Sequence, residues 1–282
     1  METAALVALV REGGRAWTNY VLAARERGTE SVSALAILEQ ELGLLCYEAL
    51  TTAERDIERW QARGFRVLPL SDRDYPENLR VVENRPPLLF AEGRLTAADR
   101  RAVSVIGTRQ PSDAGRALAR SVAEALAVAG FTVVAGLAAG IDAEAHRTVL
   151  ELQSSERARS ARTLAVLGTG LGAVYPPEHA ELQSEIAAQG TLLSQFWPDA
   201  PPTRNSFPAR NAVMSGLTLG SVIVEAGENS GTRIQARHAL AQGRVVVLMP
   251  PTMARAWAVE LTERSGVVVA QDAADVVAIF RR

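Results

Sequence analysis

The stretch FTVVAGLAAGIDAEAH, residues 131–146, joins an apolar strand to a glycine-punctuated loop and then to the start of a helix. A junction of this kind points backbone N–H groups at an anion. Similar junctions occur before it at VSVIGTRQPS, residues 103–112, and after it at EAGENSGTRIQA, residues 225–236. We therefore expect these loops to converge on one ligand-binding edge.

From residue 103 onward the sequence alternates between apolar strands and helices. Strands are predicted at VSVIG, TVVAG, TLAVLG, TLLSQF, SVIVEAG, RVVVLMP and GVVVA, each followed by a helix. Such alternation indicates parallel strands joined by right-handed crossovers, with helices on both faces of the sheet. The predicted fold is an α/β, extended Rossmann-like, doubly wound and mainly parallel sheet. Its ligands should bind at the carboxyl ends of the strands, near the switch in strand order.

The part of the chain before this alternation divides in two. Residues 1–60 carry helical periodicity without a convincing strand, which predicts a small all-helical N-terminal domain. The short apolar runs FRVLPL, residues 65–70, and PPLLFAEG, residues 86–93, then introduce the α/β domain, which we place at residues 61–282.

Composition places the chain among ordinary globular proteins. It has 282 residues, 48% of them hydrophobic, and 30 basic against 32 acidic residues, so a polyanion site must be a local patch. Every basic residue is arginine. The absence of lysine excludes a Schiff-base or P-loop lysine mechanism.

Cysteine and histidine usage argues against disulfides and metal centres. Cys46 is the single cysteine, which fits a reducing, cytoplasmic compartment. The histidines are scattered, so no metal site is expected. The apolar run at the N-terminus is too short to span a bilayer and lacks a basic start, so we expect neither a signal nor membrane association.

The first two loops offer candidate anion ligands, each with a purely structural alternative. Gly107 permits close backbone approach, Arg109 reaches an anion or is merely solvated, and Ser112 is a predicted helix N-cap. In the second loop Asp142 is predicted as an N-cap, and His146 either faces the ligand or packs beneath the loop.

Two later segments add aromatic and hydroxyl groups. PTRNSFPARN, residues 202–211, is predicted to be irregular, and it spaces Arg204, Phe207 and Arg210 three residues apart. A ring flanked by guanidinium groups suits an unstacked base and its phosphates, although a phenylalanine tucked under a loop is the alternative. The run from Ser230 to Arg233 supplies either phosphate ligands or helix caps.

Taken in order, the motifs GTRQPS, GLAAGIDAEAH, AVLGTGLGAVYP, LLSQF, FPARN, VIVEAGENSGT and GRVVVLMP resemble the DprA/Smf family of bacterial DNA-processing proteins. The resemblance covers roughly residues 60–250. An ordered set of motifs is far more specific than any single glycine pattern.

The resemblance implies a homodimeric, non-enzymatic protein without a cofactor, which binds single-stranded DNA and delivers it to the RecA recombinase during natural transformation. Because the sequence stops soon after the Rossmann body, we expect no C-terminal winged helix of the kind that some members of the family have. The residues expected to bind DNA or phosphate are Gly107, Thr108, Arg109, Ser112, Gly136, Gly140, Asp142, His146, Arg204, Phe207, Arg210, Asn211, Ser230, Gly231, Thr232 and Arg233.

The chain departs from the family pattern near these positions. Ala139 and Ala212 stand where the family usually has arginine, and Gln195 stands where it usually has glutamate. Arg233 is a gained basic residue, in SGTRIQA where the family has SGSLITA.

An enzyme of the same fold class is the alternative. Phosphoribohydrolases share the last glycine loop but need a PGGxGTxxE pattern, and this chain has Gln235 at the glutamate position. An amide cannot replace that carboxylate, so hydrolysis is disfavoured, with Glu225 and Glu228 as the remaining nearby carboxylates. GTGLGA, residues 168–173, has the wrong spacing for a dehydrogenase fingerprint.

Overall fold

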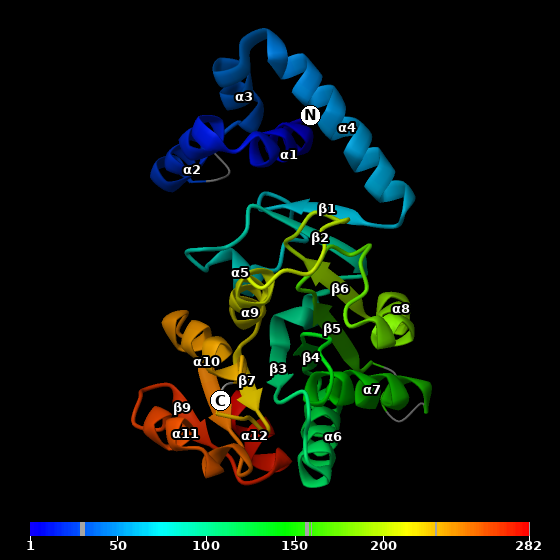
Figure 1. Cartoon of the computed structure of the whole chain (residues 1–282), viewed down its shortest axis with the longest axis vertical. Helices are drawn as coiled ribbons and strands as arrows, with labels where there is room; N and C mark the ends of the chain where they lie inside the picture. The colour runs from blue at the N-terminus through cyan, green and yellow to red at the C-terminus, as the bar shows by residue number, and fades with distance from the viewer. Residues whose placement is uncertain (29–31, 156–157, 159, 229, 282) are drawn as a thin grey trace. The chain divides into compact units, whose positions relative to one another are not determined.

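The computed structural model describes residues 1–28, 32–155, 158, 160–228 and 230–281 (Figure 1). The chain splits into two compact units, the first comprising Met1–Tyr75 and Pro86–Phe90 and the second Pro76–Arg85 and Ala91–Arg282. None of the described helices is both long and apolar enough to cross a bilayer.

The first unit is mainly helical, as the periodicity predicts. Its helices are α1 (Glu2–Glu12), α2 (Gly14–Arg27), α3 (Ala34–Leu42) and α4 (Cys46–Ala62). Residues 4–9 of α1 are buried, and this helix packs against the other three. The unit also contains β1 (Arg66–Pro69) and the first part of β2 (Leu88–Gly93), so it extends beyond residue 60. There the ring of Trp60 meets that of Phe90 edge to face, with centroids 5.1 Å apart.

The second unit contains the doubly wound sheet. Its further strands are β3 (Ala102–Ile106), β4 (Thr132–Ala135), β5 (Arg162–Val166), β6 (Thr191–Ser194), β7 (Gly220–Ile223), β8 (Val245–Leu248) and β9 (Val267–Val269). Their order is β6-β5-β4-β3-β7-β8-β9. Each neighbouring pair is parallel. The predicted fold class is therefore confirmed.

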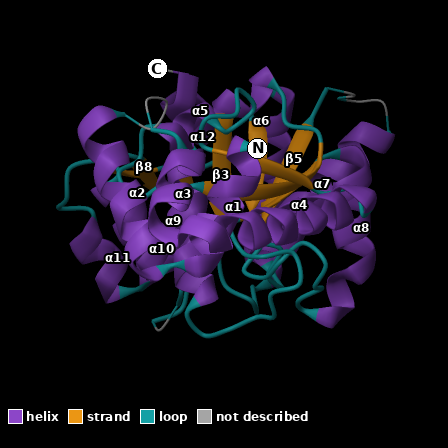
Figure 2. Ribbon diagram, turned by 90° about the horizontal axis from the view of Figure 1, so that it is seen from above, coloured by secondary structure: helices purple, strands orange, loops and turns teal. Residues whose placement is uncertain are grey.

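Helices cover both faces of this sheet. They are α5 (Glu77–Arg80), α6 (Asp113–Val128), α7 (Ile141–Ser154), α8 (Ala180–Gln189), α9 (Ser206–Leu217), α10 (Thr232–Ala241), α11 (Ala256–Leu261) and α12 (Ala273–Arg281). Helices α8, α7, α6 and α12 pack side by side, and so do α9 and α10. Figure 2 shows the strands between α6 and α12 on one side and α9 and α10 on the other.

The core lies mainly between the sheet and the layer that contains α6, α7 and α12. Apolar strand residues such as Val103, Val105 and Val133 meet Leu126 and Val149 of that layer, and all five are fully buried. Such burial is why these strands read as continuous apolar runs rather than as alternating patterns.

The strand order reverses between β3 and β7. From β3 the chain steps outward to β4, β5 and β6, and it then returns to place β7 on the other side of β3. Loops leaving parallel strands at such a reversal splay apart and leave a crevice at the carboxyl edge of the sheet. All the loops predicted to bind a ligand leave their strands at this edge.

Candidate nucleic-acid interface

The loops after β3 and β7 and the start of α7 are tied together by backbone hydrogen bonds. The N–H of Thr108 donates to Glu225 O at 2.7 Å, and the N–H of Ile141 donates to Thr108 O at 3.2 Å. Both the N–H and the hydroxyl of Ser112 donate to the Glu225 carboxylate at 3.0 Å. The three predicted junctions therefore meet at one edge.

Glycines allow this close approach. Gly140 has φ +82°, and a Cβ there would overlap Thr108 O and the backbone of Arg109. A Cβ at Gly136 would occupy the position of the Arg210 guanidinium. Gly107 likewise lies directly against Ile141 and Glu225 O. These glycines shape the loops, which is a structural role in addition to any backbone contact with a ligand.

Asp142 differs from its prediction as an N-cap. The N-cap of α7 is Gly140, and Asp142 lies inside the first turn, where its side chain is 5% exposed. Its carboxylate accepts from the N–H of Gly136 at 2.9 Å, and the N–H groups of Gly107 and Ala138 also stabilise its charge. Burial raises the pKa of Asp142, opposed by Arg210 and these donors. The carboxylate thus clamps the loops after β3 and β4.

Arg210 is a second buried side chain that connects the loops by hydrogen bonds. It is 6% exposed, and its Nη1 donates to Gly136 O at 2.5 Å and to Val166 O at 2.7 Å. Its Nε donates to Asn211 Oδ1 at 2.9 Å. Burial lowers the pKa of Arg210, and the nearby positive charge of Arg109 acts in the same direction. The guanidinium therefore holds the ends of β4 and β5 and also adds positive charge below the loop surface.

The FPARN segment is helical, which corrects the prediction of an irregular segment. Helix α9 begins at Ser206, because Thr203 and Ser206 form reciprocal side-chain bonds to each other's N–H at 3.1 Å. Spacings of three and four residues put Phe207, Arg210 and Asn211 on one face of this helix. Proline is tolerated in the first turn of a helix. The proline content of this segment therefore suggested an irregular conformation although a helix forms there.

Phe207 lies in an aromatic and cationic group that we call the Phe207 platform, formed by Phe207, Tyr175 and Arg109. The ring centroids of Tyr175 and Phe207 are 5.4 Å apart at an interplanar angle of 49°. The guanidinium carbon of Arg109 lies 5.9 Å from the centroid of Phe207. Tyr175 is 37% exposed. These side chains line a cavity of about 210 Å³, the smaller cavity, together with Glu178 and Ala139.

Sequence reasoning missed Tyr175. It belongs to the motif AVLGTGLGAVYP, which supported the family resemblance but gave no role to its aromatic residue. A single tyrosine on a loop carries no periodic signal, and its proximity to Phe207 depends on the packing of α9 against β5. Only the fold brings the two rings together.

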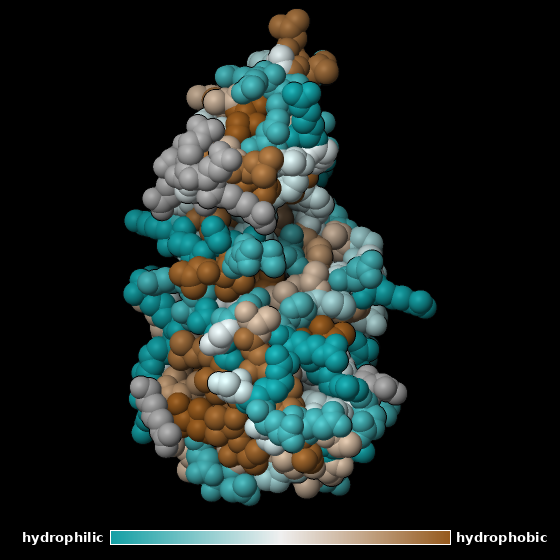
Figure 3. Space-filling view, turned by 90° about the vertical axis from the view of Figure 1, so that its left-hand side faces the viewer, coloured by the Kyte–Doolittle hydropathy of each residue, from teal (hydrophilic) through white to brown (hydrophobic). Residues whose placement is uncertain are grey.

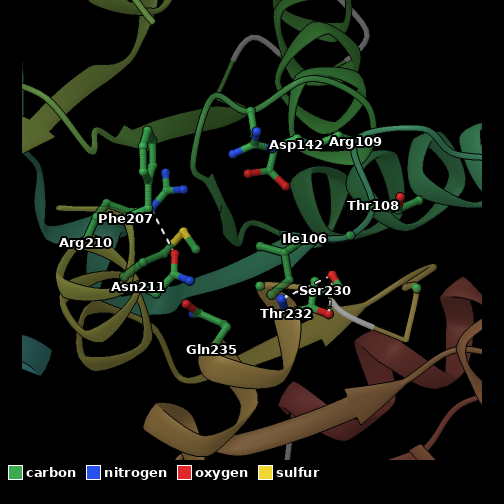
Figure 4. Close-up of a pocket in the computed structure, with 15 residues that line it drawn as sticks. Ile106, Thr108, Arg109, Asp142, Phe207, Arg210, Asn211, Ser230, Thr232 and Gln235 are labelled. Carbon is green, nitrogen blue, oxygen red and sulfur yellow. Dashed lines mark hydrogen bonds between the residues drawn. The ribbon is translucent and has the colours of Figure 1, made fainter. Parts of the chain in front are cut away.

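A larger cavity, of about 490 Å³, opens between α9, α10 and the loops after β3 and β7. Figure 4 shows Phe207, Arg210 and Asn211 on one side and Ser230, Thr232 and Gln235 on another, with Arg109 and Asp142 on the far wall. Thr108 and Gly231 also line it. The two cavities share Arg109, Ala138, Phe207 and Arg210.

Other predicted ligands lie outside both cavities. Arg204 is exposed before α9, and Ser112 caps α6 by accepting from the N–H of Gly115 at 3.0 Å, as predicted. The Arg233 guanidinium carbon lies 5.6 Å from the centroid of the Trp257 ring, and its Nη1 donates to Glu228 O. His146 is fully buried, with Nδ1 2.6 Å from Thr163 Oγ1, and burial lowers its pKa to about 3. We therefore remove His146 from the set of ligand contacts.

The arrangement of carboxylates does not favour the hydrolase alternative. Glu225 is engaged by Ser112, and Glu228 is exposed. Asp142 is the one carboxylate among the described residues that line the larger cavity, and the loop N–H groups occupy it. Gln235, at the position where the hydrolases need glutamate, lines this cavity as an amide. Within the described ranges, no group of three acidic, histidine or cysteine residues is placed to hold a metal ion.

Comparisons with known proteins agree with this fold. Protein Smf of Synechocystis sp. is 39% identical over 198 residues, covering 69% of this chain and 48% of the relative. DNA processing protein DprA of Bacillus subtilis is 32% identical over 200 residues, covering 71% of this chain and 65% of the relative. The chain thus spans between about half and two thirds of the length of these curated relatives.

Solved structures of the same fold include DNA processing protein A from Streptococcus pneumoniae, with a TM-score of 0.77 and 26% identity over 99% of this chain and 98% of that one. A structure describing the single-stranded DNA binding mode of DNA processing protein A from Helicobacter pylori has a TM-score of 0.66. It is 23% identical and covers 77% of this chain and 95% of that one, which shows the shared fold. The family model of DNA recombination-mediator protein A matches residues 66–278. The chain belongs to this family, the DprA/Smf proteins.

Proposed function

We propose that this chain is a cytoplasmic protein that binds single-stranded DNA and acts as a recombination mediator without catalysing a reaction itself. The observation that carries the proposal is the Phe207 platform at the carboxyl edge of the sheet, where two aromatic rings lie beside the exposed guanidinium of Arg109. Membership of a family of DNA recombination mediators supports it.

The platform suits single strands rather than duplexes. A base can stack on an aromatic ring only when it has left its own stack, and an arginine beside the ring can hold the adjoining phosphate. The chain has a formal net charge of −2, so this local group rather than a general field must provide the attraction. Arg204, exposed just before α9, is the further cation that we assign to the strand.

Ala139 is the departure that bears most on affinity. It lines the smaller cavity, so the arginine that the family usually has there would add a cation beside Phe207. Gln195 and Ala212 line neither cavity. We therefore propose that this chain binds DNA with fewer phosphate contacts than a typical relative, and that stacking carries a larger share of the affinity.

Fluorescence anisotropy with a labelled oligothymidine tests the proposal. We expect binding that weakens as salt rises, a much weaker response to the matching duplex, and loss of binding when Arg109→Ala and Phe207→Ala are combined. Undetectable binding at low salt, or an unchanged affinity in the double variant, would contradict the proposal.

We also propose a homodimer, formed through the exposed edge of the second unit. Strand β9 is the last strand of the sheet order, and apolar side chains are exposed on it and on the neighbouring helices: Ile234, Val259, Val268 and Val269. Figure 3 shows brown, apolar surface on this side of the second unit. Exposed apolar edges of this kind promote association. Sedimentation should show a dimer that Val268→Lys dissociates, and a monomeric wild-type chain would argue against it.

The proposed partner of the bound strand is the RecA recombinase. In a reconstituted assay we expect the wild-type chain to speed RecA loading on DNA, read as a shorter lag before DNA-dependent ATP hydrolysis. With the double variant, the lag should be as long as it is without any added chain. A wild-type chain that binds DNA but does not shorten the lag would separate DNA binding from mediation.

A further inference from the structure

The backbone at Leu137 lies in the left-handed region, which is unusual for a residue other than glycine. Its φ is +59°, and among the residues that the structure describes it is the one non-glycine residue with a positive φ. The side chain is fully buried in the loop after β4. A leucine is strained in this conformation, which persists only where the surrounding structure holds it.

The peptide groups beside Leu137 make the contacts that shape the carboxyl edge of the sheet. The N–H of Gly136 donates to the Asp142 carboxylate at 2.9 Å, and Gly136 O accepts from Arg210 Nη1. The N–H of Ala138 also stabilises the charge of Asp142, and Ala138 lines both cavities. A rotation of the backbone at Leu137 would therefore displace these hydrogen bonds and the wall that the two cavities share.

His179 holds the carbonyl group of Leu137. Its Nδ1 lies 2.9 Å from Leu137 O, and because a carbonyl oxygen only accepts hydrogen bonds, Nδ1 must carry a proton. The side chain of His179 is 5% exposed and lines neither cavity, so it does not touch a strand bound there. Any effect of His179 on DNA binding must therefore act through the residues that it holds.

His179 is also close in sequence to Tyr175. It ends the short helix Pro177–His179, and its N–H donates to Pro176 O at 3.0 Å, so the chain after Tyr175 is folded into a tight turn. The bond from His179 to Leu137 O thus fastens the segment that carries Tyr175, in the loop after β5, to the loop after β4. Tyr175 is the residue of the Phe207 platform that this segment carries.

Gln183, four residues further along, provides a comparison. It lies on α8, and its Nε2 donates to Leu171 O at 3.3 Å and to Ala173 O at 3.4 Å. Both of these acceptors belong to the loop after β5, whereas the acceptor of His179 belongs to a second loop. Substitutions of the two side chains therefore separate the support of one loop from the connection between two loops.

We propose that His179 is a positioning residue of the Phe207 platform. Its bond to Leu137 O fixes the loop that carries Tyr175 against the loop after β4, so that both aromatic rings are in place before a strand arrives. A preformed site loses less conformational freedom when its ligand binds, which raises the affinity. The inference rests on the proposed binding of single-stranded DNA.

Anisotropy of the full chain with a labelled oligothymidine tests this role. His179→Leu should weaken binding about threefold to tenfold, the equivalent of one buried hydrogen bond, with an unchanged salt slope. His179→Asn should stay within about twofold of the wild type, because its amide can donate from nearly the position of Nδ1. Gln183→Leu, which leaves the two loops connected, should weaken binding less than His179→Leu. His238→Leu, at a half-buried histidine near the end of α10, is the matched control and should bind like the wild type.

A double-mutant cycle shows which residue His179 acts through. If His179 positions Tyr175, His179→Leu should weaken binding no further in a Tyr175→Ala background. It should keep its full effect in an Arg204→Ala background, because Arg204 is exposed before α9 and lies outside these loops. A merely structural role would weaken binding to the same degree in both backgrounds. Where His179→Leu does not fold, His179→Gln replaces it, since its amide reaches the position of Nε2 rather than that of Nδ1.

Nitrogen-15 NMR of the histidine-labelled wild-type chain tests the hydrogen bond without any substitution, and the chain has only three histidines to assign. We expect a proton on Nδ1 of His179. An Nδ1 without a proton, wild-type affinity in folded His179→Leu, or additive effects of His179→Leu and Tyr175→Ala would each overturn the inference. A wild-type chain that does not bind oligothymidine would instead contradict the proposed function, so the two failures are distinguishable.

Discussion

Replacing Phe207 with alanine should remove most of the stacking energy available at the smaller cavity. The ring lines both cavities, and it lies beside Tyr175 and Arg109, so in the proposed complex one base stacks directly on it. Loss of one base–aromatic stack costs about 1–3 kcal/mol, which corresponds to roughly a 5- to 150-fold weaker affinity.

Salt dependence separates this stacking effect from a charge effect. Because the ring carries no charge, Phe207→Ala should lower the affinity for a labelled oligothymidine equally at all salt concentrations. The slope of log affinity against log salt should therefore match that of the wild type. Phe207→Trp, which keeps an aromatic face, should recover much of the lost affinity.

The control for Phe207→Ala is Tyr47→Ala, which removes an exposed aromatic ring from the first unit. Thermal unfolding of each variant confirms that the fold is intact, because the Phe207 ring also packs over Gly168. A folded Phe207→Ala protein whose affinity stays within about twofold of wild type would exclude a base stacked on this ring, since the lost stack should cost at least about 1 kcal/mol.

Three further predictions concern charge, pH and loop geometry. Arg109→Ala should reduce the salt slope of oligothymidine binding by about 0.7, the value for one phosphate contact on a single strand, whereas Arg237→Ala should leave it unchanged. Because the pKa of His146 is lowered to about 3, its neutral form adds stability at pH 6.5 and above that is lost as the pH falls toward 3. On acidification, the free energy of unfolding measured with urea should therefore fall by up to about 5 kcal/mol more in the wild type than in His146→Gln. The same pH dependence in both proteins would exclude His146 as the origin. Gly140→Ala, at φ +82° and against Thr108 O, should lower both the free energy of unfolding, by more than about 1 kcal/mol, and the DNA affinity, while Gly227→Ala, with no atom within 4 Å of its Cβ, should leave the free energy of unfolding unchanged.

The sequence was sufficient to predict the sheet because its signal is repeated. Each apolar run from VSVIG to GVVVA is followed by a helix, and this alternation leaves few topologies other than a doubly wound sheet. The position of the ligand edge follows from the same pattern, since every strand of a parallel sheet ends on the same side.

The functions of individual side chains were harder to predict, because they depend on contacts distant in sequence. Asp142 looked like a cap, and its role as a clamp depends on the N–H groups of Gly107 and Gly136 reaching it. For His146 the sequence left two positions open, facing the ligand or packed beneath the loop, and the packing of α7 on β5 buries it against Thr163. Such distant contacts have no local signature.

Photo-crosslinking shows which residues of the chain lie against the bases of a bound single strand. An oligonucleotide carrying 5-iodouracil is irradiated with the wild-type chain, and the adducts are mapped after trypsin digestion, which in this lysine-free chain cleaves at arginine alone. Phe207 is then released in the peptide of residues 205–210, and Tyr175 in that of residues 163–204. We expect adducts in one or both of these peptides. Adducts confined to other parts of the chain would contradict the assignment of the Phe207 platform as the site where single-stranded DNA binds.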